Sequence, residues 1–266
     1  MITHTSRAKQ KTMTETNGAD EIQLSRVDRW VYERQSHNGQ VAKAELEKRY
    51  AKAGRFYRVL LQRYLPKDKE SLILDLPCGE GKMVWALKEM GYGQVRGYDL
   101  DERRLGVGRK MGLDVYEGEV FEVLGAQEDG SVGGIFSVDF LEHLEKEKVI
   151  DYLQLVSAKL KNEGVFVVRM PCADSPYGGR HIFNDFSHKW AATSGVLKEL
   201  LKGAGFEKVE VFGEEPRAGM RYGRLRRVVF KGCAFVRNIL VRGMGQGKIR
   251  IWTCSMWAVA IKTNQR

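Results

Sequence analysis

Two carboxylates and two glycines near residue 80 have the spacing of a nucleotide-type binding site. The apolar run 71–76 ends in Asp75 and Leu76, and Gly79 and Gly81 follow just before a helical pattern. Glycines let the backbone pass close beneath a ligand, and the N-terminus of the next helix offers unpaired N–H groups. Asp99 ends the next apolar run, where a carboxylate can accept both hydroxyls of a ribose. These residues predict a cofactor site at the carboxyl ends of parallel strands.

The glycine spacing argues against one common class of cofactor. A dinucleotide fingerprint requires a third glycine three residues after Gly81, and Val84 occupies that position. An NAD-dependent oxidoreductase is therefore the weakest enzyme hypothesis for this chain.

The segment 75–81, Asp-Leu-Pro-Cys-Gly-Glu-Gly, resembles the first motif of the class I S-adenosylmethionine-dependent methyltransferases, which reads D-x-G-x-G-x-G. Pro77 stands where that family has its first glycine, and the two later glycines are left to shape the turn. In this family the second strand also ends in a ribose-binding acid. The resemblance implies that S-adenosyl-L-methionine is the cofactor and that its binding residues include Asp75, Pro77, Cys78, Gly79, Gly81, Asp99, Leu100 and Asp139.

The family commonly places an acid beside the adenine amino group after its third strand. The segment 118–121, Gly-Glu-Val-Phe, occurs at this point of the chain. The resemblance implies Glu119 as this acid, with Val120 beside it. Glu117 and Glu122 remain alternatives.

A second set of polar side chains suits the methyl acceptor. The segment 139–144, Asp-Phe-Leu-Glu-His-Leu, is similar to a D-x-x-E-H-L sequence that related enzymes carry at the mouth of the active site. Methyl transfer is an in-line displacement, so catalysis is placement of the acceptor, with a base if the acceptor is a hydroxyl. Imidazole titrates near neutrality, which makes His143 and His188 base candidates. Asp185 could orient the His188 ring, and Asp139 could bind the acceptor hydroxyl.

The candidate histidines have a structural alternative, because histidines in loops often satisfy backbone carbonyls. His181, in the long polar loop 170–188 that also contains His188, is a further base candidate. His188 is the strongest base candidate of the three.

The loop 170–188 also suggests a substrate class. Its P-x-A-D-S-P-x-G opening and its D-x-S-H close are similar to methyltransferases encoded with bacterial cell-surface polysaccharide genes. That resemblance implies O-methylation of a sugar or polyol in glycan synthesis. One alternative is a methyltransferase acting on RNA or on another anionic or small-molecule substrate, and another is a non-catalytic cofactor-binding partner subunit. The chain lacks the acid or asparagine followed by Pro-Pro and an aromatic that grips nucleobase amino groups, so we do not expect a nucleic-acid partner.

The elements that must position these residues alternate between short apolar runs and helical patterns. This order predicts an α/β fold with a Rossmann-like, seven-stranded, mostly parallel sheet, an antiparallel last strand and helices on both faces. We expect the strands at 71–76, 94–99, 113–116, 131–138, 164–170, 206–212 and 249–262, with a turn at 162–164.

The chain divides into three parts by composition and periodicity. Residues 1–20 are polar and without periodicity, which predicts a disordered tail. Residues 21–66 form a predicted N-terminal helical cap, and 67–266 the methyltransferase domain, with a basic helical insertion at about 214–248. The four cysteines are widely scattered with no C-x-x-C pair, so the sequence predicts neither a disulfide framework nor a metal site.

The formal charge of +10 is concentrated near the C-terminus. The segment 216–250 contains ten Lys or Arg and no acid, whereas the preceding part of the chain is close to neutral. At 100° per residue, 224–242 forms a helix with one apolar and one basic side. Such a helix can lie on an anionic membrane surface. Packing of its apolar side on the domain is the alternative, and contact with RNA comes third.

The sequence has neither a signal peptide nor an apolar run long enough to span a bilayer. We therefore expect a cytoplasmic protein, which the basic helix could hold at the inner face of the membrane. The expected substrate partner is a small-molecule or glycan acceptor. The oligomeric state stays open.

Overall fold

The computed structural model describes residues 27, 31, 41–216, 222–245, 247 and 249–263. The predicted tail, 1–20, lies outside the described residues. Of the predicted cap, 21–66, the description covers 41–66 and two isolated positions. The range 41–66 contains one long helix, α2, from Lys43 to Leu61.

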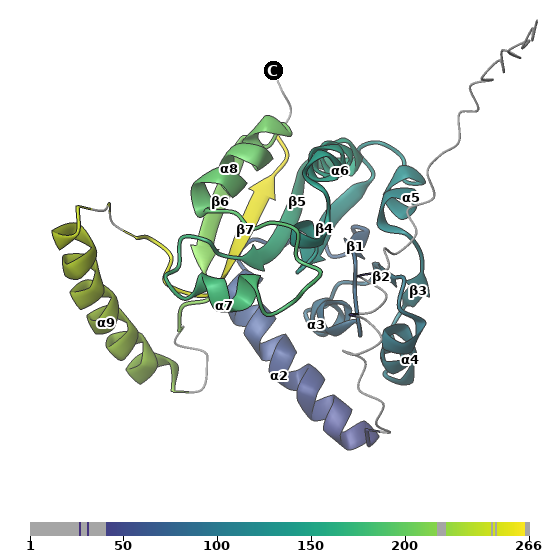
Figure 1. The fold of residues 1–266 in the computed structure, drawn as a ribbon. Coiled ribbons are helices and arrows are strands. Elements are labelled where there is room, and N and C mark those ends of the chain that lie inside the picture. The colour runs from purple at the N-terminus through teal and green to yellow at the C-terminus, as the bar shows by residue number, and fades with distance from the viewer. Residues whose placement is uncertain are drawn as a thin grey trace, which may run out of the picture.

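A seven-stranded sheet forms the centre of the molecule, with strand order β3-β2-β1-β4-β5-β7-β6 (Figure 1). The pairs from β3 through β5 are parallel, and β7 is antiparallel to both β5 and β6. The predicted fold class is confirmed. The strands are β1 (Ile73–Asp75), β2 (Val95–Asp99), β3 (Val115–Glu117), β4 (Val132–Val138), β5 (Leu160–Pro171), β6 (Lys208–Gly213) and β7 (Ser255–Ile261).

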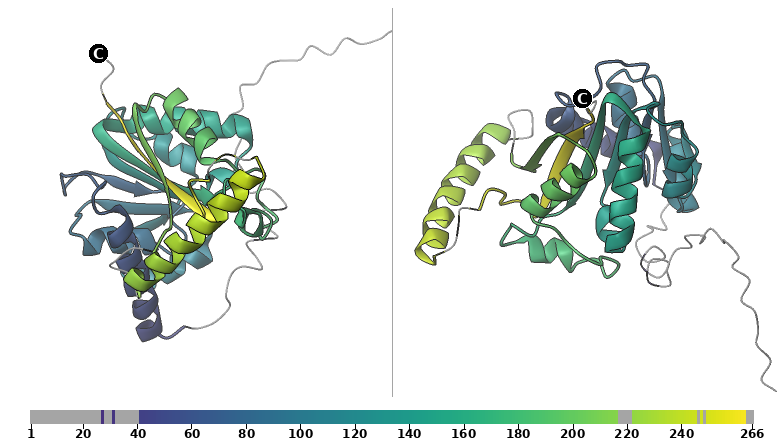
Figure 2. Two further views of the ribbon diagram at one scale, coloured as in Figure 1. Left: turned by 90° about the vertical axis from the view of Figure 1, so that its left-hand side faces the viewer. Right: turned by 90° about the horizontal axis from the view of Figure 1, so that it is seen from above.

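Helices cover both faces of this sheet, so that the domain has three layers (Figures 1 and 2). One face carries α2 together with α3 and α4, and the other carries α5, α6 and α8. The helices after α2 are α3 (Lys82–Glu89), α4 (Glu102–Lys110), α5 (Val120–Gly125), α6 (Lys146–Lys159), α7 (Gly178–Ile182), α8 (Ser194–Gly203) and α9 (Gly223–Gly243), with one 3₁₀ turn, η1 (Leu141–His143).

Side-chain alternation along the central strands fills two cores at once. In β5, Val165 and Val167 pack toward α2 and α3, whereas Phe166 and Val168 pack toward α6 and α8. This period of two is the geometry of an extended chain. It explains why the strand reads as a continuous apolar run, as is typical of parallel strands buried on both faces.

The predicted turn at 162–164 is wrong, because β5 already begins at Leu160. Leu160 pairs with Val132, and the next pair joins Val165 to Gly134, so the intervening residues bulge from the strand. Glu163 lies in this bulge with φ of 62°. The polar Asn-Glu-Gly sequence that suggested a turn therefore marks an irregularity within a strand.

The last strand is shorter than predicted. It begins at Ser255, and not at residue 249, because the preceding residues carry the chain back from α9 to the sheet. Ile251 and Trp252 in this return segment are nevertheless buried.

The predicted basic helix is α9, and it stands apart from the layered body (Figures 1 and 2). Its contacts to the body include Arg237, whose Nη1 donates to the Tyr177 hydroxyl at 3.0 Å and whose guanidinium lies over the Trp252 ring at 4.6 Å. Asn238 accepts the backbone N–H of Ile249 at 3.2 Å. No helix in the described part of the chain is long and apolar enough to cross a membrane.

Candidate active site

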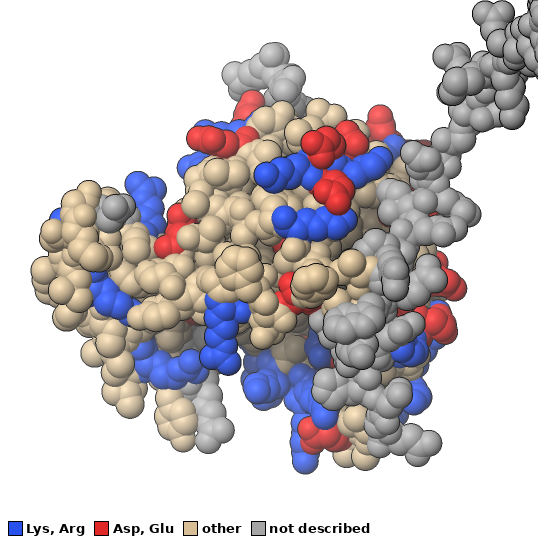
Figure 3. All heavy atoms as spheres, viewed as in Figure 1, with Lys and Arg blue, Asp and Glu red and all other residues tan. Residues whose placement is uncertain are grey.

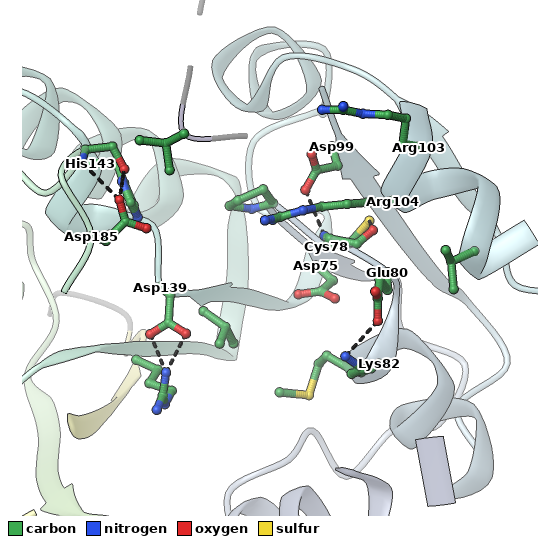
Figure 4. A pocket seen from close by; sticks show the side chains of 18 of the residues that line it. Asp75, Cys78, Glu80, Lys82, Asp99, Arg103, Arg104, Asp139, His143 and Asp185 are labelled. Carbon is green, nitrogen blue, oxygen red and sulfur yellow. Dashed lines mark hydrogen bonds and ion pairs between the residues drawn. The ribbon is translucent and has the colours of Figure 1, made fainter. Parts of the chain in front are cut away.

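A cavity of about 760 Å³ opens at the carboxyl ends of β1, β2, β4 and β5. This is the edge of an open parallel sheet at which ligands generally bind. Figure 4 shows that its labelled polar side chains form two groups. Those at the end of β1 and β2 include Asp75 and Asp99, and those after β4 include Asp139 and His143.

The glycine turn after β1 is tied directly to the end of β2. The Asp99 carboxylate accepts the backbone N–H of Gly79 at 2.8 Å through Oδ2 and that of Asp101 at 2.8 Å through Oδ1. Gly79 and Gly81 have φ of 55° and 78°, conformations that side chains with a Cβ rarely adopt. A Cβ on Gly97 would lie 2.7 Å from the Cβ of Cys78, so β2 needs a glycine there to let the turn approach.

Two buried carboxylates give this end of the cavity its charge. Burial raises the pKa of Asp75 well above its ordinary value, and the nearby Asp99 adds to that shift. Burial also raises the pKa of Asp99, although its hydrogen bonds to the N–H groups of Asp101 and Gly79 oppose the shift. Cationic side chains from α2, α3 and α4 surround the same end; they include Arg49, Lys82, Arg103 and Arg104. The arrangement suits a ligand that carries hydroxyls and charges of both signs.

At the opposite end, two histidines and a buried glutamate lie together. The side chain of Glu142 has no exposed surface, and its Oε1 lies 3.9 Å from Nε2 of His188. The His143 and His188 ring centroids are 4.7 Å apart. Nδ1 of His188 lies 2.9 Å from the Ile182 carbonyl, and Nδ1 of His143 lies 2.9 Å from the Ser187 hydroxyl. The loop after α7 thus meets the turn after β4 in one cluster.

The Asp185 carboxylate contacts Ser187, and its expected role in orienting the His188 ring stays a prediction. Its Oδ1 accepts the backbone N–H of Ser187 at 2.9 Å and the Ser187 hydroxyl at 2.6 Å. The carboxylate that the structure brings toward the His188 imidazole is that of Glu142. Asp185 therefore reaches the histidines through Ser187, whose hydroxyl contacts the His143 ring.

Arg169 connects Asp139 to the edge of the sheet. Its guanidinium donates to both carboxylate oxygens of Asp139, to Oε1 of Glu214 and to the hydroxyl of Ser255. Burial acts to lower the pKa of Arg169, but Asp139 and Glu214 more than offset it, so that its pKa lies above the ordinary value. Asp139 is thereby held at the mouth of the cavity, with its backbone at φ of 53°.

Most of the predicted site residues line this one cavity. They are Asp75, Pro77, Cys78, Gly79, Asp99, Asp139, His143, Asp185 and His188. Gly81 lies in the supporting turn. Leu100, Glu119 and Val120 are not among the lining residues, and the Glu119 carboxylate accepts the N–H groups of Phe121 and Glu122 at the start of α5. Their assignment to the cofactor stays a prediction.

Glu142 and Arg169 are among the lining residues that did not enter the predicted set. Glu142 belongs to the D-x-x-E-H-L segment, but nothing in the sequence indicates that its carboxylate is buried. Arg169 could have been recognised from the sequence, because it is a charged residue inside the apolar run of a central strand. Such a charge needs a partner, and two carboxylates provide it.

Residues 47–211 match the model of a family described as a methyltransferase domain. The chain belongs to this methyltransferase family. The match spans more than half of the chain and includes both groups of cavity residues. No curated protein matches the chain.

Solved methyltransferase structures share the fold. An S-adenosylmethionine-dependent methyltransferase from Archaeoglobus fulgidus has a TM-score of 0.61 at 21% identity, covering 84% of this chain and 100% of its own. One from Mesorhizobium loti has a TM-score of 0.52 at 19% identity, covering 78% and 98%. Phosphoethanolamine N-methyltransferase 2 from Haemonchus contortus, in complex with S-adenosyl-L-methionine, has a TM-score of 0.51 at 16% identity, covering 86% and 62%.

The chain is an S-adenosylmethionine-dependent methyltransferase, and its cavity fits that cofactor. Asp99 and Asp75 can accept hydroxyl and ammonium donors, and the cationic group on α2, α3 and α4 matches a carboxylate. Gly79 lines the cavity and has no Cβ, so its backbone can come close to a ligand. The assignment of the Asp75–Asp99 end to the cofactor, and of the end with Glu142, His143 and His188 to the acceptor, stays a prediction.

Proposed function

We propose that this methyltransferase transfers a methyl group to a hydroxyl oxygen of a sugar or other polyol in cell-surface glycan synthesis. The observation that carries the proposal is the acceptor end of the cavity, where His143 and His188 lie beside Glu142. S-adenosylmethionine, when bound, supplies an electrophilic methyl group. A hydroxyl acceptor must lose a proton during attack, and an imidazole is the side chain suited to take it near neutral pH.

The surrounding residues suit a polyhydroxylated acceptor. Asp139 can accept a hydroxyl, and Arg169 holds its carboxylate in place through both oxygens. Asn184 and Asp185 line the same end of the cavity and add further polar groups. Several directed donors and acceptors discriminate between hydroxyls better than an apolar pocket can. The predicted sugar or polyol substrate is consistent with this lining.

Methyl transfer from labelled S-adenosylmethionine tests the proposal. The acceptor panel contains nucleotide-linked sugars, lipid-linked saccharides, RNA oligonucleotides and small amines. We expect label in the first two groups, released as methyl ethers on acid hydrolysis. Label confined to RNA or to amines would contradict the proposal.

The exposed face of α9 suggests where the acceptor is found. Most of the large apolar residues of α9 are more than half exposed; they include Leu225, Val228, Val229, Phe235, Val236, Ile239 and Leu240. The side toward the body carries Arg237 and Asn238, which make its contacts there. The alternative in which the apolar side packs on the domain therefore does not describe this helix.

We propose that the occupant of this face is an anionic membrane surface. Figure 3 shows uncharged (tan) surface interrupted by blue basic side chains over α9. At 100° per residue, Arg224, Lys231 and Arg242 lie beside the apolar face of the helix. In this position the bases can contact lipid headgroups while the apolar side chains enter the boundary of the acyl chains. Each such base contributes about 1 kcal/mol near an anionic leaflet. A peripheral position at the inner face of the membrane would bring the cavity to a lipid-linked glycan.

A further inference from the structure

The acceptor cluster has the composition and the spacing of a metal site. The ligand atoms of Glu142, His143 and His188 all lie within 4.8 Å of one another. Two of these residues belong to η1, and the third follows α7, so the cluster forms only when the loop packs on the turn after β4. Backbone bonds hold that packing, since the N–H of Lys189 donates to the Glu142 carbonyl at 2.8 Å.

Glu142 is the residue that the known parts of the site leave unexplained. Its side chain has no exposed surface, and neither of its carboxylate oxygens has a hydrogen-bond partner in the described part of the chain. Its distance of 3.9 Å from His188 Nε2 is too long for a hydrogen bond. A buried carboxylate without donors costs free energy of folding unless it is neutralised, paired or bound to a metal. Glu142 is also one of the residues that line the cavity.

The hydrogen-bond network assigns the tautomers of both histidines. A carbonyl can only accept, so His188 carries a proton on Nδ1, which donates to Ile182, and its lone pair is on Nε2. The Ser187 hydroxyl donates to Asp185 and therefore accepts from Nδ1 of His143. The lone pair of the neutral His143 ring is then also on Nε2. Histidines that bind metals are typically held in this way, through the second ring nitrogen, by a carbonyl or a carboxylate-linked group.

We propose that Glu142, His143 and His188 bind a divalent cation, and that this ion holds the acceptor hydroxyl opposite the methyl donor. Two imidazoles and one carboxylate, without thiolate, favour a borderline or hard ion such as Mn²⁺ or Zn²⁺. Three protein ligands leave coordination positions for an acceptor oxygen, as in catalytic metal sites. A cation would lower the pKa of that hydroxyl, so that its proton passes to water as the oxygen takes the methyl group and the sulfonium leaves as the neutral thioether. In this assignment His143 and His188 act as ligands and not as the base. This catalytic role rests on the proposed O-methylation, whereas the binding of the ion does not.

The geometry requires little adjustment. At metal–ligand distances of about 2.0 to 2.2 Å, two ligand atoms on one ion are separated by about 3 to 4.4 Å. Ligand atoms that lie 4.8 Å apart therefore have to approach by about 0.4 to 1.8 Å, which side-chain rotations can supply. Asp139 lies at the mouth of the same cavity, but its carboxylate is paired with Arg169. We therefore assign Asp139 to contact with the acceptor and not to the metal.

Titration with Mn²⁺, followed by the electron paramagnetic resonance signal of the free ion, tests the binding. The full chain is first dialysed against a chelator and is measured without cofactor or acceptor. We expect one saturable site, with affinity reduced at least tenfold in Glu142→Gln and in His188→Ala, and competition by Zn²⁺. Ser187→Ala removes only the group that orients His143 and should cost roughly 10- to 100-fold. His181→Ala is the matched control, because His181 lines the same cavity outside the cluster.

A second readout separates binding from folding. Mn²⁺ should raise the melting temperature of the wild-type protein and of His181→Ala. It should not change the melting temperature of Glu142→Gln, whatever the stability of that isosteric variant without metal. No saturable site, or equal binding by wild type and Glu142→Gln, would refute the assignment. Full methyl transfer after chelation would remove the catalytic role while leaving the proposed O-methylation intact. Absence of transfer to any sugar would contradict that function without affecting the metal titration.

Discussion

The Asp99 carboxylate accepts the backbone N–H of Gly79 at 2.8 Å, so the acid that ends β2 also holds the turn that follows β1. The same side chain binds the N–H of Asp101 through its other oxygen. A ribose hydroxyl at this position would therefore meet a carboxylate whose orientation is already set before the cofactor arrives.

Replacement of Asp99 should weaken cofactor binding. Asp99→Ala removes a charged acceptor and should cost about 1.5 to 3 kcal/mol of binding free energy for S-adenosylmethionine or S-adenosylhomocysteine, measured by calorimetry. Asp99→Asn keeps one oxygen for Gly79 and should lose less. Asp114→Ala, on an exposed carboxylate paired with Lys88, is the control. Unchanged affinity in Asp99→Ala would exclude its role in the cofactor site.

Asp75 should make the stability of the cofactor-free protein depend on pH. Because burial raises its pKa in the folded state, its contribution to stability is full below the unfolded pKa of about 3.9 and is lost as pH rises through the folded value. Asp75→Asn removes this loss. The variant should therefore be more stable than wild type near pH 8, by roughly 1 to 3 kcal/mol, and the difference should shrink as pH falls toward 4. Denaturant melts between pH 4.5 and 8 measure it, and a constant difference would contradict the expectation.

His188 should serve the acceptor and not the cofactor. His188→Ala should leave the dissociation constant of S-adenosylhomocysteine nearly unchanged and lower turnover by roughly 10² to 10⁴. Its ring lies at the Glu142 end of the cavity, whereas the cofactor residues lie at the end of β1 and β2. His181→Ala should lower turnover less. If His188→Ala turns over as fast as wild type with the true acceptor, this histidine has no part in the reaction.

The α9 face should bind vesicles that contain anionic lipid. We expect the protein to sediment with vesicles of phosphatidylglycerol and phosphatidylcholine but not of phosphatidylcholine alone, and to be released by salt, because surface charge is screened. Lys231→Glu with Arg242→Glu, or Phe235→Ser with Ile239→Ser, should abolish sedimentation. Lys198→Glu with Lys202→Glu makes the same charge change on α8 and should have no effect.

Two other occupants of the α9 face give different results. A second copy of the chain would produce a dimer in sedimentation velocity that Phe235→Ser with Ile239→Ser dissociates, in the absence of lipid. RNA would produce a gel shift that depends on the bases but not on Phe235. Either result, without binding to anionic vesicles, would overturn the membrane assignment.

The sequence predicted the sheet well because its strands are apolar runs whose order and length satisfy simple rules of connection. It did not predict the bulge at 161–164, because a polar Asn-Glu-Gly segment has the same composition in a bulge as in a turn. The sequence predicted that α9 is amphipathic, but it did not predict which side of the helix contacts the body. Glu142 could not be recognised as buried, since periodicity does not predict burial in a single 3₁₀ turn.

The pairing of β6 with β7 has a consequence for how this protein can vary. Gly213 pairs with Met256, so the two strands are neighbours and form a hairpin whose connection is the whole α9 excursion. Closing a longer loop costs little, about 0.6 kcal/mol for each doubling of its length. The segment that joins β6 to β7 can therefore be lengthened, changed in sequence or replaced by a short turn while the two strands keep their register. The proposed membrane contact and the methyl-transfer site therefore lie on separate segments of the chain, and either can change without the other.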